Sequence, residues 1–198
     1  SAFSYTRRMS QTDNPAQLNL QTCAAASAVI AGHLAQSSDA TRLETTFARL
    51  AAESCVPNGL AHVSWRAETS LRDVGEAQAQ IWLHLDASAA LPMICQRCMS
   101  PTTLDVTSQR WFRFVADEAT AEMEDDECEE DVLVLPPRLD LLALVEDELL
   151  MSLPLVPMHD ECPVPVVTQV ADRDFVDVPV ERTHPFADLK LKMKASDT

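Results

Sequence analysis

The chain has 198 residues, enough for one domain with a buried core and flexible ends. Its 15 lysines and arginines stand against 31 aspartates and glutamates, which gives a formal net charge of −16. Because nucleic-acid affinity comes largely from cationic side chains that displace counterions, this balance argues against extensive RNA binding and favours a basic protein partner. No apolar run approaches the roughly 18 residues of a membrane helix, so no membrane association is expected.

The N-terminal part predicts one unstructured segment and one helix. Residues 1–14 are polar and lack a core pattern, so they are expected to form a disordered lead-in to a domain over 15–165. Leu43, Phe47 and Leu50 then recur at helical spacing, which predicts a short amphipathic helix.

Three following segments alternate apolar and polar residues with a period of two. They cover residues 62–68, 78–85 and 104–115. Such alternation in consecutive segments predicts an antiparallel sheet with one buried face.

An acidic run and a strong helix follow the predicted strands. Residues 117–131 hold ten acids and no base, a composition typical of a solvated loop or a frayed helix, and we expect an acidic loop here. The pattern of residues 139–153 predicts a helix that Pro154 ends. Its apolar face carries Leu142, Val145, Leu149 and Leu153, with Asp140, Asp147 and Glu148 on the opposite side. The tail, 166–198, has no sustained periodicity and is expected to be flexible.

These elements predict an α+β fold. An antiparallel β-sheet would carry a CxxC turn and be packed by one or two helices, between flexible N- and C-terminal segments.

Cysteine spacing provides the main candidate site. Cys95 and Cys98 form a CxxC knuckle after a strand-like segment, and His159 with Cys162 is the only comparable second pair. Two such pairs can complete a tetrahedral zinc site if folding brings them together. Two alternatives remain open, namely plain reduced thiols and a redox CxxC, although a redox motif normally opens a helix.

Glu146 interrupts the apolar face of the predicted helix, and two interpretations follow. It is either a partly exposed carboxylate at the edge of the stripe, or a buried partner of Arg97 or Arg110. With its neighbours Asp147 and Glu148 it is a candidate for structural or interaction roles. No residues are assigned a catalytic role, because no nucleophile–base pair or phosphate-binding glycine loop is evident.

Three stretches together resemble the YceD family, the large ribosomal RNA subunit accumulation proteins. They are the CQRC motif at 95–98, the segment LDLLALVEDELLMSLPLVPMHDEC at 139–162, and HPFADLKLK at 184–192. The second is similar to the family's "LDLLALVEDELLLALP" helix followed by "VPxH" and a Cys. The third is similar to an "NPFAxLxxLK" ending, with His184 where the family often has Asn.

The resemblance implies a cytoplasmic, non-enzymatic factor that supports accumulation or processing of large-subunit (23S-type) ribosomal RNA. A ribosomal protein or a pre-ribosomal large-subunit particle is the expected partner, with limited direct rRNA contact and no small-molecule substrate. We expect transient masking of a ribosomal protein's RNA-binding surface, since the chain is so acidic. The alternatives are a small zinc-stabilised RNA- or ribosome-contacting module and, less favoured, a thiol redox protein. Residues 184–192, with Pro185 and Phe186, form a possible docking segment.

Overall fold

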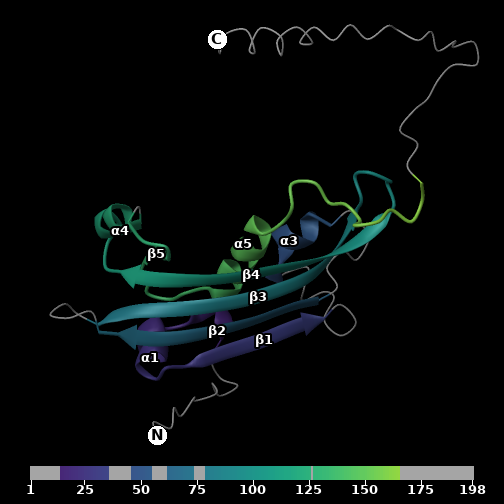
Figure 1. The fold of residues 1–198 in the computed structure, drawn as a ribbon. Helices are drawn as coiled ribbons and strands as arrows, with labels where there is room; N and C mark the ends of the chain where they lie inside the picture. Colours follow the sequence, from purple (N-terminus) through teal and green to yellow (C-terminus); the bar gives the residue numbers. More distant parts are fainter. Residues whose placement is uncertain (1–13, 36–45, 55–61, 74–78, 126, 166–198) are drawn as a thin grey trace, which may run out of the picture. The chain divides into compact units, whose positions relative to one another are not determined.

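The computed structural model describes residues 14–35, 46–54, 62–73, 79–125 and 127–165 (Figure 1). The predicted lead-in up to residue 13 and the tail 166–198 lie outside the described residues. Pro185 and Phe186, in the predicted docking segment 184–192, therefore also lie outside them.

Five strands form one sheet in sequential order: β1 (Val29–Ala35), β2 (His62–Arg72), β3 (Gln80–Ile94), β4 (Pro101–Val115) and β5 (Asp131–Val134). The first three pairings are antiparallel, which confirms the predicted α+β class. The β4–β5 pair is parallel. Residues 116–130 form a crossover that returns the chain from Val115 to the level of Phe112, where β5 begins. Strand β1 had no counterpart among the predicted strands.

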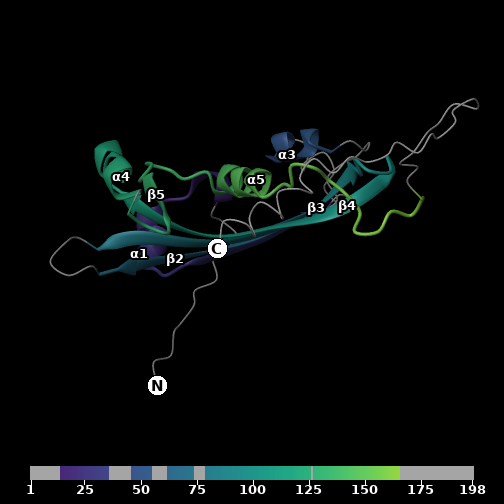
Figure 2. The same ribbon diagram turned by 45° about the horizontal axis from the view of Figure 1, so that its top comes forward.

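Helical elements cover one face of this sheet and enclose the main core. They are η1 (Pro15–Gln17), α1 (Leu20–Ala25), α3 (Ala48–Ala52) and α5 (Leu141–Met151). Figure 2 shows α3 and α5 on the same side of the long β3–β4 pair. The predicted 139–153 helix is confirmed as α5, and Asp140 caps its first turn by accepting a hydrogen bond from Ala143 N–H. Among the described residues, no helix is both long and apolar enough to cross a membrane.

Strict alternation along β3 explains how the core forms. Every second residue from Ile81 to Met93 is buried against the helices, while the residues between them lie on the other face. On β1, Gly32 lies opposite Trp65 of β2, and a Cβ on Gly32 would lie 2.4 Å from the indole ring. Only glycine leaves space for that ring, so β1 can pair closely with β2.

The acidic segment is more ordered than the predicted loop, since it contains helix α4 (Glu118–Asp125). Ala121 of this helix packs with Val115 and Val132 in a second small core. Beside it lies the buried Arg113 of β4, which donates to Glu124, to Glu130 (3.0 Å) and to Cys128 Sγ (3.0 Å). A base from outside the run therefore offsets part of the self-repulsion that predicted a loop.

Candidate metal centre

The CxxC motif forms the tight turn between β3 and β4. Cys95 follows the last residue of β3, and its N–H donates to Ser100 O at 2.9 Å, while Met99 N–H donates to Cys95 O at 2.9 Å. Met99 has a φ of 57°, in the left-handed region, which lets the chain reverse. Because of this turn, the two sulfur atoms of the motif lie near one another.

The segment after α5 brings the second pair to this turn. Gln96 N–H donates to the carbonyl of the buried Pro157 at 2.8 Å, which fixes the segment beside the hairpin. Cys98 Sγ then lies 3.3 Å from His159 Nδ1, and Cys95 Sγ lies 4.0 Å from Cys162 Sγ. The four donor atoms lie within 4.8 Å of one another, so the structure brings together all four predicted ligands.

The distances fit a shared metal ion better than a disulfide. With Zn–S near 2.3 Å and Zn–N near 2.0 Å, tetrahedral geometry requires S···S separations of about 3.8 Å and S···N separations of about 3.5 Å. The observed 4.0 Å and 3.3 Å are close to both values. A disulfide requires sulfurs about 2.05 Å apart, and Cys95, Cys98 and Cys162 are free thiols. The donor set of three sulfurs and one imidazole is typical of structural zinc sites.

Outer contacts orient the imidazole. His159 Nε2 lies 3.1 Å from Pro101 O, and a hydrogen bond there places the proton on Nε2. Nδ1 is then left with its lone pair toward Cys98 Sγ. A metal-ligating histidine commonly donates its second ring N–H to a carbonyl in this way.

Arg97, between the two cysteines of the motif, holds the second segment in place. Its Nε donates to Cys162 Sγ at 3.1 Å, and its Nη2 donates to the carbonyls of His159 at 2.6 Å and Asp160 at 3.2 Å. The contact with Cys162 is the main cause of a raised pKa for Arg97. Burial, followed by contact with another thiol, raises the pKa of Cys162.

Two of the thiols are predisposed to ionise. Burial opposes ionisation of Cys95, but the backbone N–H groups of Cys98, His159 and Arg97 outweigh it and lower the Cys95 pKa to about 5. The pKa of Cys98 is also lowered, since Ser100 N–H and a neighbouring thiol outweigh the effect of burial. A hydrogen bond to Cys95 raises the pKa of His159. Thiolates are the form that binds metal, so the turn prepares these sulfurs for it.

Low thiol pKa values also occur in redox CxxC motifs, which normally open a helix. Here the motif lies in a hairpin turn, and strand β4 follows it from Pro101. The arrangement therefore resembles a metal knuckle more than a redox site.

Glu146 is buried, but its predicted partners were wrong. Its carboxylate accepts from the backbone N–H of Arg49 (2.8 Å) and of Leu50 (3.0 Å), and it forms an ion pair with the Arg49 guanidinium at 2.9 Å. Arg97 instead lies at the cysteines, and Arg110 pairs with another acid of the helix. Arg49 and Glu146 are 97 residues apart, and the sequence alone did not show that α3 and α5 would bring them into contact.

The neighbours of Glu146 differ from each other. Asp147 is half exposed and pairs with Arg49 at the surface. Glu148, predicted on the exposed side, is buried, because α5 lies against β4. It accepts from Ser108 Oγ at 2.9 Å and lies 3.5 Å from Arg110 Nε. The acids of α5 therefore fasten the helix to α3 and β4.

Arg49 and Arg113, which hold these carboxylates, were not predicted. Arg49 belongs to a short helix with no distinguishing motif, and Arg113 lies at a strand position where a charge normally faces solvent. The only signal for Arg113 in the sequence was its position, together with Arg110, just before ten acids.

The fold and the site define a class: a small α+β domain whose β-hairpin carries a Cys₃His cluster able to bind a metal such as zinc. Residues 83–192, more than half of the chain, match the family model described as large ribosomal RNA subunit accumulation protein YceD. The chain belongs to the YceD family. No solved structure matches it.

Proposed function

We propose that this protein is a non-enzymatic, cytoplasmic factor that supports accumulation or processing of large-subunit ribosomal RNA. The family match carries the proposal, since the family is named for this role and not for a reaction. The matched residues include the CxxC hairpin, α5 and the second pair of ligands, so the family match covers the candidate metal centre.

In this proposal Cys95, Cys98, His159 and Cys162 hold zinc, and the zinc is structural. Four protein ligands fill a tetrahedral site and leave no position for substrate, unlike catalytic zinc sites. When bound, the ion would cross-link the hairpin to the segment that follows α5. Arg97 would keep this segment aligned through its carbonyl contacts.

The partner in this proposal is a basic protein, such as a ribosomal protein of an immature large subunit. The charge of −16 supports it, as does the exposure of Glu118, Glu122 and Glu127 on the acidic segment. Such a surface would mask the partner's RNA-binding face until assembly. Direct rRNA contact would be limited.

Depletion and complementation test the proposal. Depleting the protein should lower the ratio of large- to small-subunit rRNA and add immature large particles on a gradient. Wild type should restore both, whereas Cys98→Ser should not, because the knuckle loses a ligand. A normal rRNA ratio after complete depletion would contradict the proposal.

The masking mechanism needs its own variants. Neutralising Glu118, Glu122 and Glu127 together should weaken co-purification of ribosomal proteins. A matched triple change at the exposed Glu53, Asp73 and Asp105 should leave it nearly unchanged. Equal losses from both sets would reject the acidic segment as the contact surface.

A further inference from the structure

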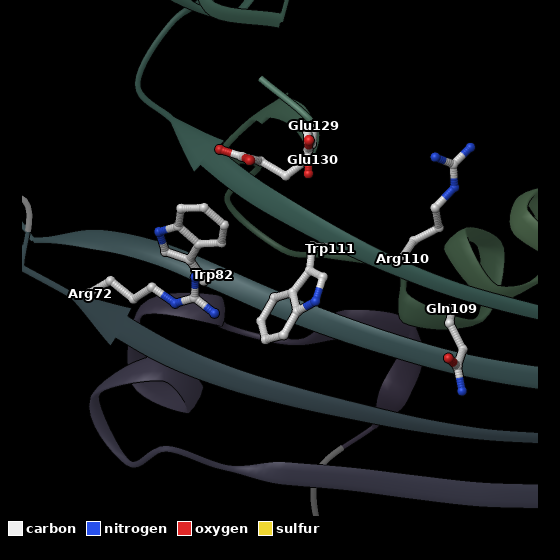
Figure 3. A pocket seen from close by; sticks show the side chains of 7 residues that line it. All are labelled: Arg72, Trp82, Gln109, Arg110, Trp111, Glu129 and Glu130. Atoms are coloured by element: carbon white, nitrogen blue, oxygen red, sulfur yellow. The ribbon is translucent and has the colours of Figure 1, made fainter. Parts of the chain in front are cut away.

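A cleft lies away from the metal centre, around Trp82 on the face of the sheet opposite the core, because Trp82 alternates with the buried Ile81 and Leu83 along β3. It has a volume of about 530 Å³ and is open to solvent. Figure 3 shows its lining, which combines two indoles, two guanidinium groups, an amide and two carboxylates: Arg72, Trp82, Gln109, Arg110, Trp111, Glu129 and Glu130.

The chain's own Arg72 already occupies the aromatic part of this cleft. Its guanidinium carbon lies 4.0 Å from the centre of the Trp82 ring and 4.5 Å from that of Trp111. The two indoles meet edge to face with centroids 6.3 Å apart. Trp82 Nε1 is buried without an acceptor among the described residues, so stacking holds this ring rather than a hydrogen bond. The indole pair is therefore a surface that accepts a guanidinium group.

Arg72 can leave its position more easily than Arg110 or Glu130 can, because those two lining residues are held by ion pairs. Arg110 is paired with Asp131 and Glu148, and Glu130 is paired with Arg113. Arg72 is exposed at the end of β2, and among the described residues no carboxylate forms an ion pair with it. Trp111 is 42% exposed, so a displaced Arg72 would leave an accessible indole face.

The surrounding charge indicates what would replace Arg72. Glu129 is exposed and has no cationic partner among the described residues, and the acidic segment with α4 adjoins it. A phosphate backbone would be repelled here, whereas an arginine side chain would gain both the indole faces and the carboxylates.

We propose that the Trp82–Trp111 cleft binds an arginine side chain from a basic protein partner, and that this arginine displaces Arg72. The inference deepens the proposed function, on whose basic partner it rests. Arg72 acts as an internal competitor that covers the indoles in the free protein. A partner that presents several arginines close together displaces it.

Binding of a labelled synthetic arginine–glycine peptide to the full chain, measured by fluorescence anisotropy at low salt, tests this. Trp111→Leu keeps apolar volume but removes the ring, and it should weaken binding about fivefold, the effect of one partly exposed cation–π contact. Arg72→Gln should tighten binding about threefold or more, and Arg72→Lys should have a smaller effect in the same direction because lysine stacks less well.

Arg138→Gln, at an exposed position outside the cleft, removes the same charge and is the matched control. It should change affinity less than about twofold if long-range charge is screened. A citrulline–glycine peptide should not bind detectably. Circular dichroism of each variant shows whether the fold is retained.

Three results would overturn the inference: equal effects of Arg72→Gln and Arg138→Gln, no effect of Trp111→Leu, or Trp111-dependent binding of single-stranded RNA instead of the peptide. If the peptide result is negative while depletion still lowers large-subunit rRNA, only the cleft assignment fails. If depletion leaves rRNA normal, the proposed function fails whatever the peptide does.

Discussion

Glu146 stabilises α3 from another part of the chain, and its removal gives a sharp prediction. The residue that precedes α3, Phe47, has no side-chain capping hydrogen bond. The first turn of α3 is instead capped by Glu146 of α5, which accepts from the N–H groups of Arg49 and Leu50. Glu146 is only 5% exposed, so water cannot replace its carboxylate at these donors.

Glu146→Ala should lower the free energy of unfolding by about 2–4 kcal/mol. Hydrogen bonds to a charged group contribute about 1.5–3 kcal/mol, and buried donors left without an acceptor are destabilising by a similar amount. Glu146→Gln keeps one carbonyl oxygen for the two backbone donors and should lose about half as much. Asp147→Ala, next in sequence but paired with Arg49 at the surface, should have a much smaller effect.

Urea unfolding followed by circular dichroism measures these differences, with the slope m held common to all variants. The predicted order is wild type, Asp147→Ala, Glu146→Gln, Glu146→Ala, from most to least stable. If Glu146→Ala fell within about 0.5 kcal/mol of wild type, the size expected of an unimportant surface change, the capping role would be wrong.

Three further predictions concern the second core and the sheet. Arg113→Ala should destabilise the fold by about 2–4 kcal/mol in urea unfolding, because a buried cation with three partners is lost; an unchanged midpoint would contradict this. The pKa of Glu130 is lowered from 4.5, since its own backbone N–H and Arg113 outweigh burial. The stabilisation that ionised Glu130 gives the fold is therefore present above pH 4.5 and is lost as the pH falls through the lowered pKa of the folded state. Glu130→Gln should flatten the dependence of unfolding free energy on pH below pH 4.5, and profiles parallel to wild type would contradict this role of Glu130. Gly32→Ala should cost about 1–3 kcal/mol, because its Cβ would overlap Trp65, and a neutral result would show that the ring can move.

Sequence patterns predicted the helix and the long strands, because each of these elements follows from the spacing of its own apolar residues. Apolar spacing and Pro154 predicted α5, and alternation predicted the long strands β2, β3 and β4. Strand β1 was not predicted, because glycine is unfavourable in strands. Gly32 is required here because the ring of Trp65 occupies the space that a side chain would need.

Tertiary contacts limited what could be predicted about charged residues. Glu146 was recognisable as an anomaly on an apolar face, yet its partner Arg49 depends on how α3 packs against α5. Glu148 was placed on the exposed side because helical periodicity carries no information on β4, which supplies Ser108 as its donor. For the same reason, nothing local indicated that the Arg72 guanidinium packs against both Trp82 and Trp111.

The ligands of the candidate metal site could be predicted from the sequence, but the contacts that bring the two pairs together could not. Residues three apart in a turn can share a metal, which made the pairs Cys95–Cys98 and His159–Cys162 recognisable from spacing. Closure of the 60-residue gap depends on Pro157 O, which accepts from the hairpin, and on the contacts of Arg97. Both use backbone carbonyls, which any sequence provides, so the sequence did not reveal them.

Metal content of the natively purified full chain tests the central claim most directly. Elemental analysis should give about one zinc per wild-type chain, as expected for a single tetrahedral site. Cys98→Ser should lose the metal, while the matched change Cys128→Ser, at a thiol outside the cluster, should retain it. A folded wild-type chain without metal, whose unfolding midpoint is unaffected by added zinc or chelator, would contradict the account.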